Sequence, residues 1–530
     1  MKKLYFGGPV LTMERTSPRV EALLTEEGTI LAVGKLSDLE ALAGNAERVC
    51  LHGRTLCPGF ADGHSHLCGE GLFSFQCDLT DCTGFDDLLR RIRVFREKRE
   101  LIHGEAIVCR GYDPECMAEH AHPDAGVLDT LGFDNPVVCV HQSGHVVTAN
   151  TAAMRSCGLD DSFAAPSGGF AGRSADGHLT GYFEESAAAP LAPLRKNTPE
   201  QAEEGILLAQ EEYIRHGFTT VQDGSANAPG RLALFECLNR RGALRTDVVV
   251  YLKALADDEA WACAFTQYGN REPHGRLTLG GVKLFLDGSP QARTAWMLEP
   301  YAGETEYRGY PKLSDETVEK TVLRAARQGV QMLAHCNGDA AAEQYLRAWG
   351  KAVQEVPEAK NLRSVMVHAQ TVQDSQLARM APLGMMPSFF VGHCWYWGDT
   401  HLRNFGPERG RRISPVDRAL ALGLPCSFHQ DCPVTRPDML HSVWCAVNRI
   451  TKNGVSIGPE HRISAYDAMI CATRGGAYTY FSENRRGVLR PGAAADLVLL
   501  SSDPTAVDPM AIRDIQVLAT VKDGETLFEA

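Results

Sequence analysis

Hydrophobic and polar residues follow one pattern at the two ends of the chain and another in its long middle. The ends contain short apolar runs separated by turn residues, which predict strands at 3–6, 20–25, 29–33, 48–51, 495–500 and 515–522. Glu26-Glu27-Gly28 fits the turn of a hairpin between the second and third of these runs. We therefore expect residues 1–57 and 487–530 to build one small sheet together.

The middle of the chain repeats a short apolar run followed by a stretch of helical character. Ten such runs predict strands at 60–66, 106–109, 137–141, 219–223, 248–252, 281–287, 331–335, 364–368, 385–390 and 425–431. Alternating strands and helices are typical of a parallel sheet, and without a Gly-x-Gly-x-x-Gly turn a (β/α)8 barrel is favoured over a doubly wound sheet. One or two runs exceed the eight strands needed, so we expect a catalytic barrel over 58–486 with an insertion within about 70–215.

Composition and charge narrow the class of protein. With 44% hydrophobic and 22% charged residues, the 530-residue chain resembles an ordinary soluble globular protein. A formal net charge of −13 argues against nucleic acid or an anionic membrane as its main partner. The 17 cysteines show no Cys-x-x-Cys pair, and the N-terminus has no apolar signal segment. We expect reduced thiols, a cytoplasmic location and no membrane span.

Lys283 stands in the middle of the apolar run 280–289, where a lysine needs an explanation. A buried ammonium without a partner costs roughly several kcal/mol, so another group must interact with the end of this side chain. If CO2 carboxylates the amine, the side chain becomes an anionic carbamate with two oxygens that could bridge two metal ions. The alternative is an internal salt bridge with Asp287 or Asp431.

Candidate metal ligands share one position in the pattern, because each ends an apolar run. They are His64, His66, His335, His368 and Asp431. Catalytic residues of β/α barrels collect at the carboxyl ends of the strands, and the spacing of His64 and His66 turns both imidazoles to one face. A capping Asp or a satisfied core His remains the alternative for each residue alone. A second such pair, His120 and His122, lies in a polar stretch and is expected at the surface.

Several segments, taken as a set in this order, resemble the amidohydrolase superfamily, and within it the YtcJ-like branch that includes N-substituted formamide deformylases. They are Pro-Gly-Phe-Ala-Asp-Gly-His-Ser-His at 58–66, Val-Lys-Leu-Phe-Leu-Asp-Gly-Ser at 282–289, His-Cys-Asn-Gly-Asp at 335–339, Val-His-Ala-Gln at 367–370, His-Gln-Asp-Cys-Pro-Val at 429–434 and Gly-Ala-Ala-Ala-Asp-Leu-Val at 492–498. The resemblance implies a metal-dependent hydrolase on a (β/α)8 TIM-like barrel, with a small β-sandwich formed by both termini.

The resemblance also implies roles for individual residues. His64 and His66 would hold one metal, His335 and His368 a second, and carbamylated Lys283 would bridge the two. Asp431 would bind the first metal and act as general base and then acid, while a metal-bridging hydroxide attacks the substrate. Two divalent ions are expected, with zinc preferred for imidazole and carboxylate ligands and iron or manganese as alternatives. A mononuclear site with fewer ligands also remains open.

Six further residues are candidates for contacts with the substrate. His145 resembles a family position in the loops over the site, and Arg293 could clamp a carbonyl or carboxylate unless it is an ordinary loop arginine. The aromatic segment 388–399 offers His393, Trp395 and Trp397 for a pocket, or for packing a lid. His429 shares a strand face with Asp431, at a position where many relatives have a small residue.

These observations favour an amidohydrolase that cleaves a non-peptide C–N bond, of amide or formamide type, in a small molecule. An esterase or lactonase could use the same hydroxide. A deaminase commonly has one metal and no bridging lysine, so Lys283 counts against it. A non-catalytic ligand-binding or regulatory relative is the last alternative. The expected partner is a small-molecule substrate, with a homodimer as the default assembly.

Overall fold

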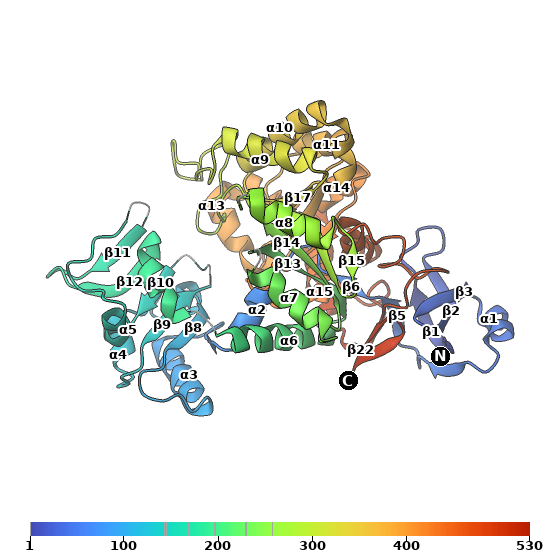
Figure 1. The fold of residues 1–530 in the computed structure, drawn as a ribbon, viewed down its shortest axis with the longest axis horizontal. Helices are drawn as coiled ribbons and strands as arrows, with labels where there is room; N and C mark the ends of the chain where they lie inside the picture. The colour runs from blue at the N-terminus through green and yellow to red at the C-terminus, as the bar shows by residue number, and fades with distance from the viewer. Residues whose placement is uncertain are drawn as a thin grey trace. The chain divides into compact units, whose positions relative to one another are not determined.

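Two units make up the chain in the computed structural model, which describes residues 2–142, 144, 146–166, 169–195, 198–227, 230–256 and 258–530. The main unit combines residues 1–67 with 210–530, and the inserted unit spans residues 68–209. Helices α2 (Leu67–Phe73) and α6 (Pro199–Arg215) contain the two boundaries (Figure 1). Each unit has its own hydrophobic core.

Both ends of the chain meet in one sheet of the main unit, with strand order β23-β22-β21-β5-β1-β2-β3 and β4 beside β1. The junction is the antiparallel pair β5–β21, where Pro58 faces Leu497. The strands are β1 (Lys2–Leu11), β2 (Arg19–Glu26), β3 (Thr29–Gly34), β4 (Glu47–Cys50), β5 (Thr55–Pro58), β21 (Leu497–Leu500), β22 (Val517–Lys522) and β23 (Glu525–Glu529). The sequence pattern missed β5 because all four of its residues are buried, which removes the alternation that marks a half-exposed strand. Helix α1 (Leu36–Ala43) packs against β1 and β2.

A curled sheet of eight parallel strands lies at the centre of the main unit, in chain order from β6 to β20. Its strands are β6 (Phe60–Ala61), β13 (Phe218–Ala226), β14 (Asp247–Lys253), β16 (Leu277–Phe285), β17 (Gln331–Cys336), β18 (Val365–His368), β19 (Met386–Phe389) and β20 (Ser427–Phe428). A short strand, β15 (Pro273–His274), adds to β16 in antiparallel fashion. The Gly63 amide, just after β6, donates to the Phe428 carbonyl at 2.9 Å, so the first and last strands are also linked.

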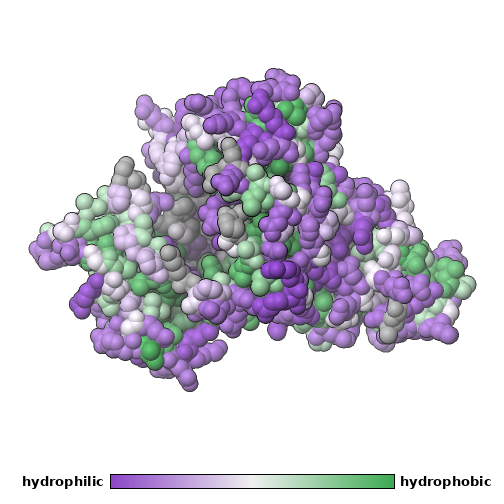
Figure 2. All heavy atoms as spheres, viewed as in Figure 1, coloured by the Kyte–Doolittle hydropathy of each residue, from purple (hydrophilic) through white to green (hydrophobic). Residues whose placement is uncertain are grey.

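Helices follow most strands of this sheet and cover it. They are α7 (Gly230–Arg240), α8 (Asp258–Tyr268), α9 (Asp315–Arg327), α10 (Asp339–Glu355), α11 (Asp374–Met380), α12 (His393–Tyr396), α13 (Gly398–Arg411), α14 (Val416–Ala421), α15 (Met439–Asn448), α16 (Ala465–Ile470) and α17 (Gly476–Thr479). Helix α9 shows why they form: the Ser314 hydroxyl caps its first turn, and Val318, Val322 and Ala325 form one buried stripe. Their polar faces give the hydrophilic surface over α9 and α10 in Figure 2.

One helical segment presses against the two edge strands of the parallel sheet. It is the π-helical turn Cys471–Gly475 that continues into α17. A Cβ atom on Gly475 would lie 1.9 Å from the Cys426 carbonyl oxygen, and one on Gly476 would lie 2.2 Å from that of Ala61. Only glycine permits this approach, and the segment therefore packs on both edges at once.

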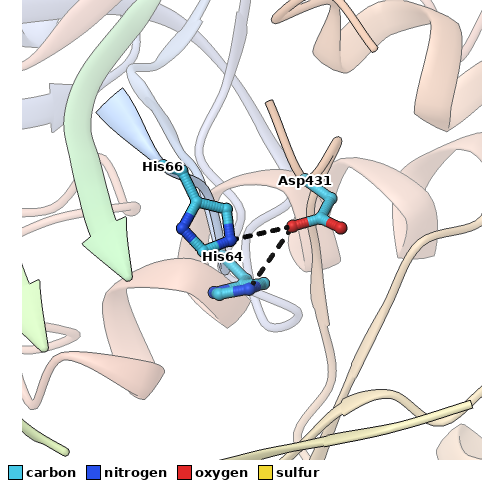
Figure 3. Close-up of side chains that lie close together, drawn as sticks. All are labelled: His64, His66 and Asp431. Carbon is cyan, nitrogen blue, oxygen red and sulfur yellow. Dashed lines mark ion pairs between the residues drawn. The ribbon is translucent and has the colours of Figure 1, made fainter. Parts of the chain in front are cut away.

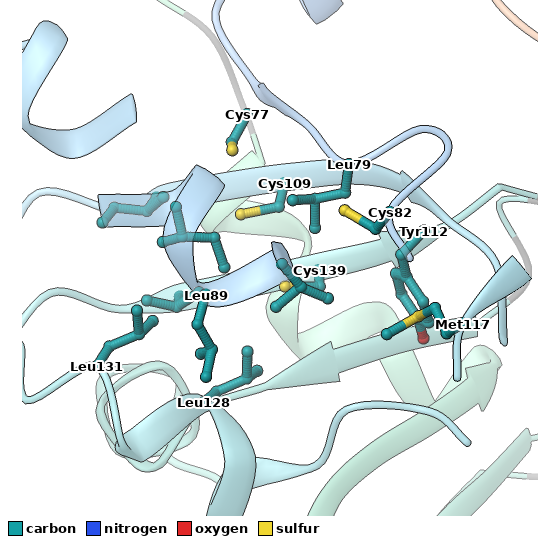
Figure 4. Close-up of a cluster of buried hydrophobic side chains, with 14 residues drawn as sticks. Cys77, Leu79, Cys82, Leu89, Cys109, Tyr112, Met117, Leu128, Leu131 and Cys139 are labelled. Carbon is teal, nitrogen blue, oxygen red and sulfur yellow. The ribbon is translucent and has the colours of Figure 1, made fainter. Parts of the chain in front are cut away.

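The inserted unit contains a separate six-stranded sheet with order β11-β12-β10-β9-β8-β7. Its strands are β7 (Cys77–Asp78), β8 (Ile107–Tyr112), β9 (Val137–His141), β10 (Val146–Ala149), β11 (Gly169–Arg173) and β12 (Leu179–Glu185), with helices α3 (Phe85–Lys98), α4 (Ala125–Asp129) and α5 (Thr151–Ser156). Two of the ten predicted strand runs, 106–109 and 137–141, thus lie here, and the other eight correspond to the strands of the parallel sheet. Figure 4 shows the core under α3, where Cys109 and Cys139 point into a cluster with Leu89 and Leu128.

The second His-x-His pair lies in the inserted unit, and the structure corrects part of its expected placement. His120 is exposed, as expected. His122 is half-buried instead, with Nδ1 2.9 Å from the Tyr112 hydroxyl and its ring 5.6 Å from that of His141. All the cysteines in the described part of the chain are free thiols. No helix among the described residues combines the length and apolar character that crossing a membrane requires.

Candidate metal centre

The carboxyl ends of the first and last parallel strands bring three predicted ligands together. His64 and His66 follow β6, and Asp431 follows β20, the strand that the Gly63 amide links to β6. Asp431 Oδ1 lies 3.4 Å from His64 Nε2 and 3.5 Å from His66 Nε2 (Figure 3). Among the described residues, these three form the one group whose potential ligand atoms all lie within 4.8 Å of one another.

Strand β13 fixes the tautomers of both imidazoles. Gln222 Oε1 lies 2.6 Å from His64 Nδ1, while Gln222 Nε2 donates to the Gly63 carbonyl at 3.3 Å. Because the amide nitrogen faces that carbonyl, Oε1 faces His64, and Nδ1 of His64 must carry the proton. His66 Nδ1 donates to the Gly224 carbonyl at 2.8 Å. Both rings therefore direct an unprotonated Nε2 towards Asp431, as outer partners do for metal-binding histidines.

Asp431 completes an arrangement that a cation would stabilise. Its Oδ1 is buried and accepts no hydrogen bond, although two imidazole lone pairs face it. Burial and the nearby Lys283 hold the pKa of His64 well below its ordinary range, so that ring supplies no proton to the carboxylate near neutral pH. A divalent cation satisfies all three groups at once, and imidazole nitrogens with a carboxylate oxygen are the donors that zinc prefers.

Lys283 on β16 is 1% exposed, and its Nζ lies 2.9 Å from His64 Nε2. Burial lowers the pKa of this amine from 10.5 to about 7, although the Asp431 carboxylate raises it in part. The neutral amine, the form that reacts with CO2, is therefore well populated near neutral pH. No ion pair in the described part of the chain joins Lys283 to Asp287 or Asp431, so the salt-bridge alternative is not formed.

Asp287 interacts with backbone N–H groups and not with Lys283. Its carboxylate accepts backbone N–H groups from Trp296 at 3.0 Å, Asn337 at 3.0 Å and Gly338 at 2.7 Å. Burial raises the pKa of Asp287 to about 7, although these hydrogen bonds lower it in part. The side chain ties the loop after β16 to the loop after β17, and so positions the end of the strand that contains His335.

The second predicted pair of ligands lies beside the first group. His335 ends β17 and His368 ends β18, with His335 Nδ1 3.0 Å from His368 Nε2. His368 Nε2 is 3.9 Å from Asp431 Oδ2. His335 Nε2 lies 3.1 Å from the Gly288 carbonyl oxygen and 3.0 Å from Asn337 Nδ2, so the ring donates to the carbonyl when its proton is on Nε2 and accepts from the amide when its proton is on Nδ1. Burial holds the pKa of both imidazoles well below its ordinary range.

Left-handed backbone conformations occur at the strand ends of the centre. The φ angles of His368, Ala369 and Asp431 are 71°, 45° and 53°. Each such non-glycine residue costs about 1–3 kcal/mol, and this kind of strain gathers at functional sites. These conformations therefore lower the stability of the fold, and they orient the side chains of His368 and Asp431.

The predicted substrate contacts separate into those near the centre and those elsewhere. His393 is buried, with its ring 6.0 Å from that of His368 and 5.5 Å from Trp397, and its Nδ1 has no hydrogen-bond partner. His429 contacts His368, with 3.1 Å between Nε2 and Nδ1. The structure does not bring Trp395 to this group, because its ring packs 5.2 Å from Trp444 on α15.

Two further predicted contacts are Arg293 and His145. The Arg293 side chain is 36% exposed, pairs with Glu304 at 2.8 Å and stacks over Tyr301, contacts that fit the alternative of an ordinary loop arginine. His145 lies outside the described residues. Sequence reasoning missed Gln222, although a polar residue inside the apolar run 219–223 is the same signal that singled out Lys283.

Comparisons with known proteins identify the family of the sequence. The amidohydrolase family profile matches residues 49–528. YtcJ of Bacillus subtilis (strain 168), named as an amidohydrolase, is 26% identical over 550 residues that cover 100% of both chains. The N-substituted formamide deformylase of Arthrobacter pascens is 26% identical, over 98% of this chain and 97% of its own.

The fold has a counterpart of the same extent among solved structures. An uncharacterized metal-dependent hydrolase from Pyrococcus horikoshii OT3 superposes with a TM-score of 0.78 at 24% identity, covering 96% of this chain and 99% of the other. The predicted resemblance to the YtcJ-like branch is confirmed. Since the family profile extends over most of the sequence and the relatives over nearly all of it, the chain belongs to the amidohydrolase family.

Proposed function

We propose that this protein is a metal-dependent hydrolase that cleaves a C–N bond of amide or formamide type in a small molecule. The observation that carries the proposal is Asp431 Oδ1, a buried carboxylate oxygen that accepts no hydrogen bond and faces the Nε2 lone pairs of His64 and His66. The Lys283 amine can donate to His64 Nε2, but Asp431 Oδ1 accepts no hydrogen bond, and a bound cation would stabilise this oxygen together with both imidazoles.

The proposal includes the remaining ligands of a binuclear centre, and their position beside this group supports it. His335 would contribute Nδ1 and His368 Nε2 to a second ion, since these atoms face each other across 3.0 Å. Lys283 would be carbamylated: its neutral amine adds to CO2, an N–C bond forms, and one proton leaves to solvent. The pKa of about 7 for this amine supports that step. Zinc is the proposed ion for both positions because of the imidazole and carboxylate donors.

Two divalent ions held by these residues would lower the pKa of a water molecule enough to make hydroxide available near neutral pH. Asp431 would take the water proton on Oδ2, because Oδ1 faces the two imidazoles, and would return it to the leaving nitrogen as the C–N bond breaks. Gln222 and the Gly224 carbonyl would keep the ligand tautomers of His64 and His66 throughout. The substrate thus gains a C–O bond and releases an amine, and Asp431 regains its charge.

The domain arrangement that fits this activity is also proposed. Eight parallel strands in chain order, with the Gly63–Phe428 hydrogen bond between the first and last, support a closed (β/α)8 barrel over residues 58–486 with an insertion. The sheet from residues 1–57 and 487–530 would form a β-sandwich beside the barrel. In such barrels the reaction takes place at the carboxyl ends of the strands, where this centre lies.

The nature of the scissile bond rests on the relatives. The similarity to an N-substituted formamide deformylase supports an amide-type bond over an ester. Lys283 favours hydrolysis over the deamination alternative, because a bridging carbamate belongs to a two-metal site. A homodimer and a cytoplasmic location complete the proposal.

Metal analysis joined to a substrate panel tests the proposed function. The purified protein is analysed for metal content and offered matched amides, formamides, esters and aminated heterocycles. We expect about two zinc ions per chain, a carbamate signal in carbon-13 NMR after labelled bicarbonate is added, and turnover of the amides or formamides. A metal-loaded protein that hydrolyses only esters, releases only ammonia, or turns over nothing would favour the esterase, the deaminase or the non-catalytic alternative in turn.

A further inference from the structure

His429 is a buried histidine beside the candidate centre that the proposed mechanism does not use. It follows β20, lies two residues before Asp431, and its side chain has no solvent exposure. Both ring nitrogens have partners, with Nε2 3.1 Å from His368 Nδ1 and Nδ1 2.8 Å from the Ser388 hydroxyl oxygen. Since both nitrogens are directed to neighbouring side chains, we argue the role of His429 through these neighbours.

His368 is the neighbour whose chemistry depends on this contact. A neutral imidazole carries one proton, and two positions are open to it in His368. With the proton on Nδ1, the ring donates to His429 and directs a lone pair from Nε2 towards the cluster. With the proton on Nε2, that position is blocked for any cation. His368 can therefore be a ligand through Nε2 only while His429 Nε2 accepts its Nδ1 proton.

The contacts run from the Gly288 carbonyl through His335, His368 and His429 to Ser388. The two ends of this series differ in where they place the ring protons. At one end the Gly288 carbonyl accepts from His335 when the proton of this ring is on Nε2, and His335 Nδ1 then presents a lone pair to His368 Nε2. Without a cation that lone pair is best met by an N–H of His368, which places the His368 proton on Nε2. At the other end Ser388 can either donate to His429 Nδ1 or accept from it, because a hydroxyl does both.

A cation bound between His335 and His368 would reverse the direction of these hydrogen bonds. His368 then holds its proton on Nδ1 and donates to His429 Nε2, and His429 holds its proton on Nδ1 and donates to Ser388 Oγ. Both arrangements contain the same number of protons, so the reversal changes tautomers and not charge. This matters in a buried site, where an added charge would be costly.

We propose that His429, backed by Ser388, is a positioning residue that selects the ligand tautomer of His368, and that metal binding switches both rings from the Nε2-protonated to the Nδ1-protonated form. This inference rests on the proposed function, because it needs a cation at His335 and His368. Its consequence for this chain is that the affinity of the second metal depends on a side chain that does not touch it.

Two variants of His429 test whether the ring acts as a hydrogen-bond acceptor or only fills space. His429→Gln places an amide oxygen near the position of Nε2 and can still accept from His368, whereas His429→Leu fills a similar volume without an acceptor. His461→Leu is the matched control, because His461 is also buried but pairs with Asp417. Melting of each metal-free protein reports whether the variant is folded.

Zinc titration of the metal-free proteins against a fluorescent chelator is the first measurement. We expect wild type and His429→Gln to bind two ions per chain with similar affinities. In His429→Leu the second ion should bind about 10- to 100-fold more weakly while the first is unchanged, which is the usual effect of losing an outer partner. Nitrogen-15 NMR of the histidine rings should show the His368 proton on Nε2 without zinc and on Nδ1 with zinc.

The outcomes distinguish this inference from the function on which it rests. If wild type binds two ions and folded His429→Leu binds both equally well, the positioning role is wrong while the binuclear centre stands. The same holds if His429→Gln is as defective as His429→Leu, or if the His368 tautomer does not change with zinc. If wild type binds no second ion, the binuclear function and the inference fail together.

Discussion

The two units of this protein each contain adjacent parallel strands with buried side chains, and they use those positions in opposite ways. In the inserted unit, Cys77, Cys109 and Cys139 stand next to one another across β7, β8 and β9, under the aliphatic face of α3 (Figure 4). In the main unit, comparable buried positions hold Gln222 and Lys283.

The difference shows how a buried polar residue can be interpreted. Thiols pack as small hydrophobic groups, and burial keeps them unreactive. A buried lysine or glutamine without a function would lower stability, so each needs a partner. Here those partners are His64 and the site around it. The inserted unit is therefore expected to tolerate changes that the strand ends of the main unit do not.

The largest expected effect concerns Asp431. Asp431→Asn should lower turnover about 10²- to 10⁴-fold, because the amide cannot accept the proton from water. Its oxygen can still bind, so metal content should stay close to that of wild type. Steady-state kinetics with metal analysis checks both, and the control is Asp374→Asn on α11, an exposed carboxylate that pairs with Arg412 at 3.6 Å. Turnover close to wild type would remove Asp431 from proton transfer.

A core substitution in the inserted unit should give a loss of another kind. Leu88 on α3 is fully buried, and Leu88→Ala should destabilise this unit by about 2–5 kcal/mol through the cavity it leaves. Hydrogen exchange of the amides in α3 and β8 measures the loss. Zinc binding by His64, His66 and Asp431 should not change, and a parallel loss of zinc would contradict the separation of the two units.

An intermediate effect is expected at Gln222. Gln222→Leu removes the acceptor that holds the His64 proton on Nδ1, so zinc should bind about 10- to 100-fold more weakly. Gln222→Glu keeps an acceptor at that position and should retain more of the affinity. Competition with a chelator gives the values. Equal affinities for wild type and Gln222→Leu would show that His64 does not need this partner.

The smallest effect is expected from the thiols of the inserted unit. Burial raises the pKa of Cys109 well above its ordinary value, so almost no thiolate is present at pH 8. Because the thiolate is the reactive form, Cys109 should react with a maleimide only after unfolding, whereas exposed Cys263 reacts in the native protein. Peptide mapping after labelling identifies the sites. Native labelling of Cys109 would show that this core opens readily.

Much of the architecture can be predicted from local pattern. Eight of the ten apolar runs became the parallel strands, and the other two became β8 and β9 of the insertion. A strand in such a sheet is buried on both faces, so its run of apolar residues is visible without knowledge of its neighbours. The four histidines and Asp431 were found because each interrupts such a run at its end. The strand β5 was missed because no alternation marks it.

The contacts of these residues were not predictable in the same way. Arg293 pairs with Glu304, and Trp395 packs against Trp444, although both fit a substrate pocket by sequence position. Either outcome depends on which neighbour lies nearer once the loops are in place. Periodicity holds no information on that choice, because it reports the face of an element and not the identity of its neighbour.

The sequence by itself determined the family, the parallel-strand plan and a set of candidate metal ligands around a lysine in an apolar run. Only the tertiary structure decided the protonation pattern: His64 held by Gln222 across 158 residues of chain, Lys283 beside His64, and His368 facing His429. The physical reason is one of range. Burial and strand ends follow from neighbouring residues, whereas a tautomer depends on a donor or acceptor about 3 Å away that the chain supplies from a distant strand.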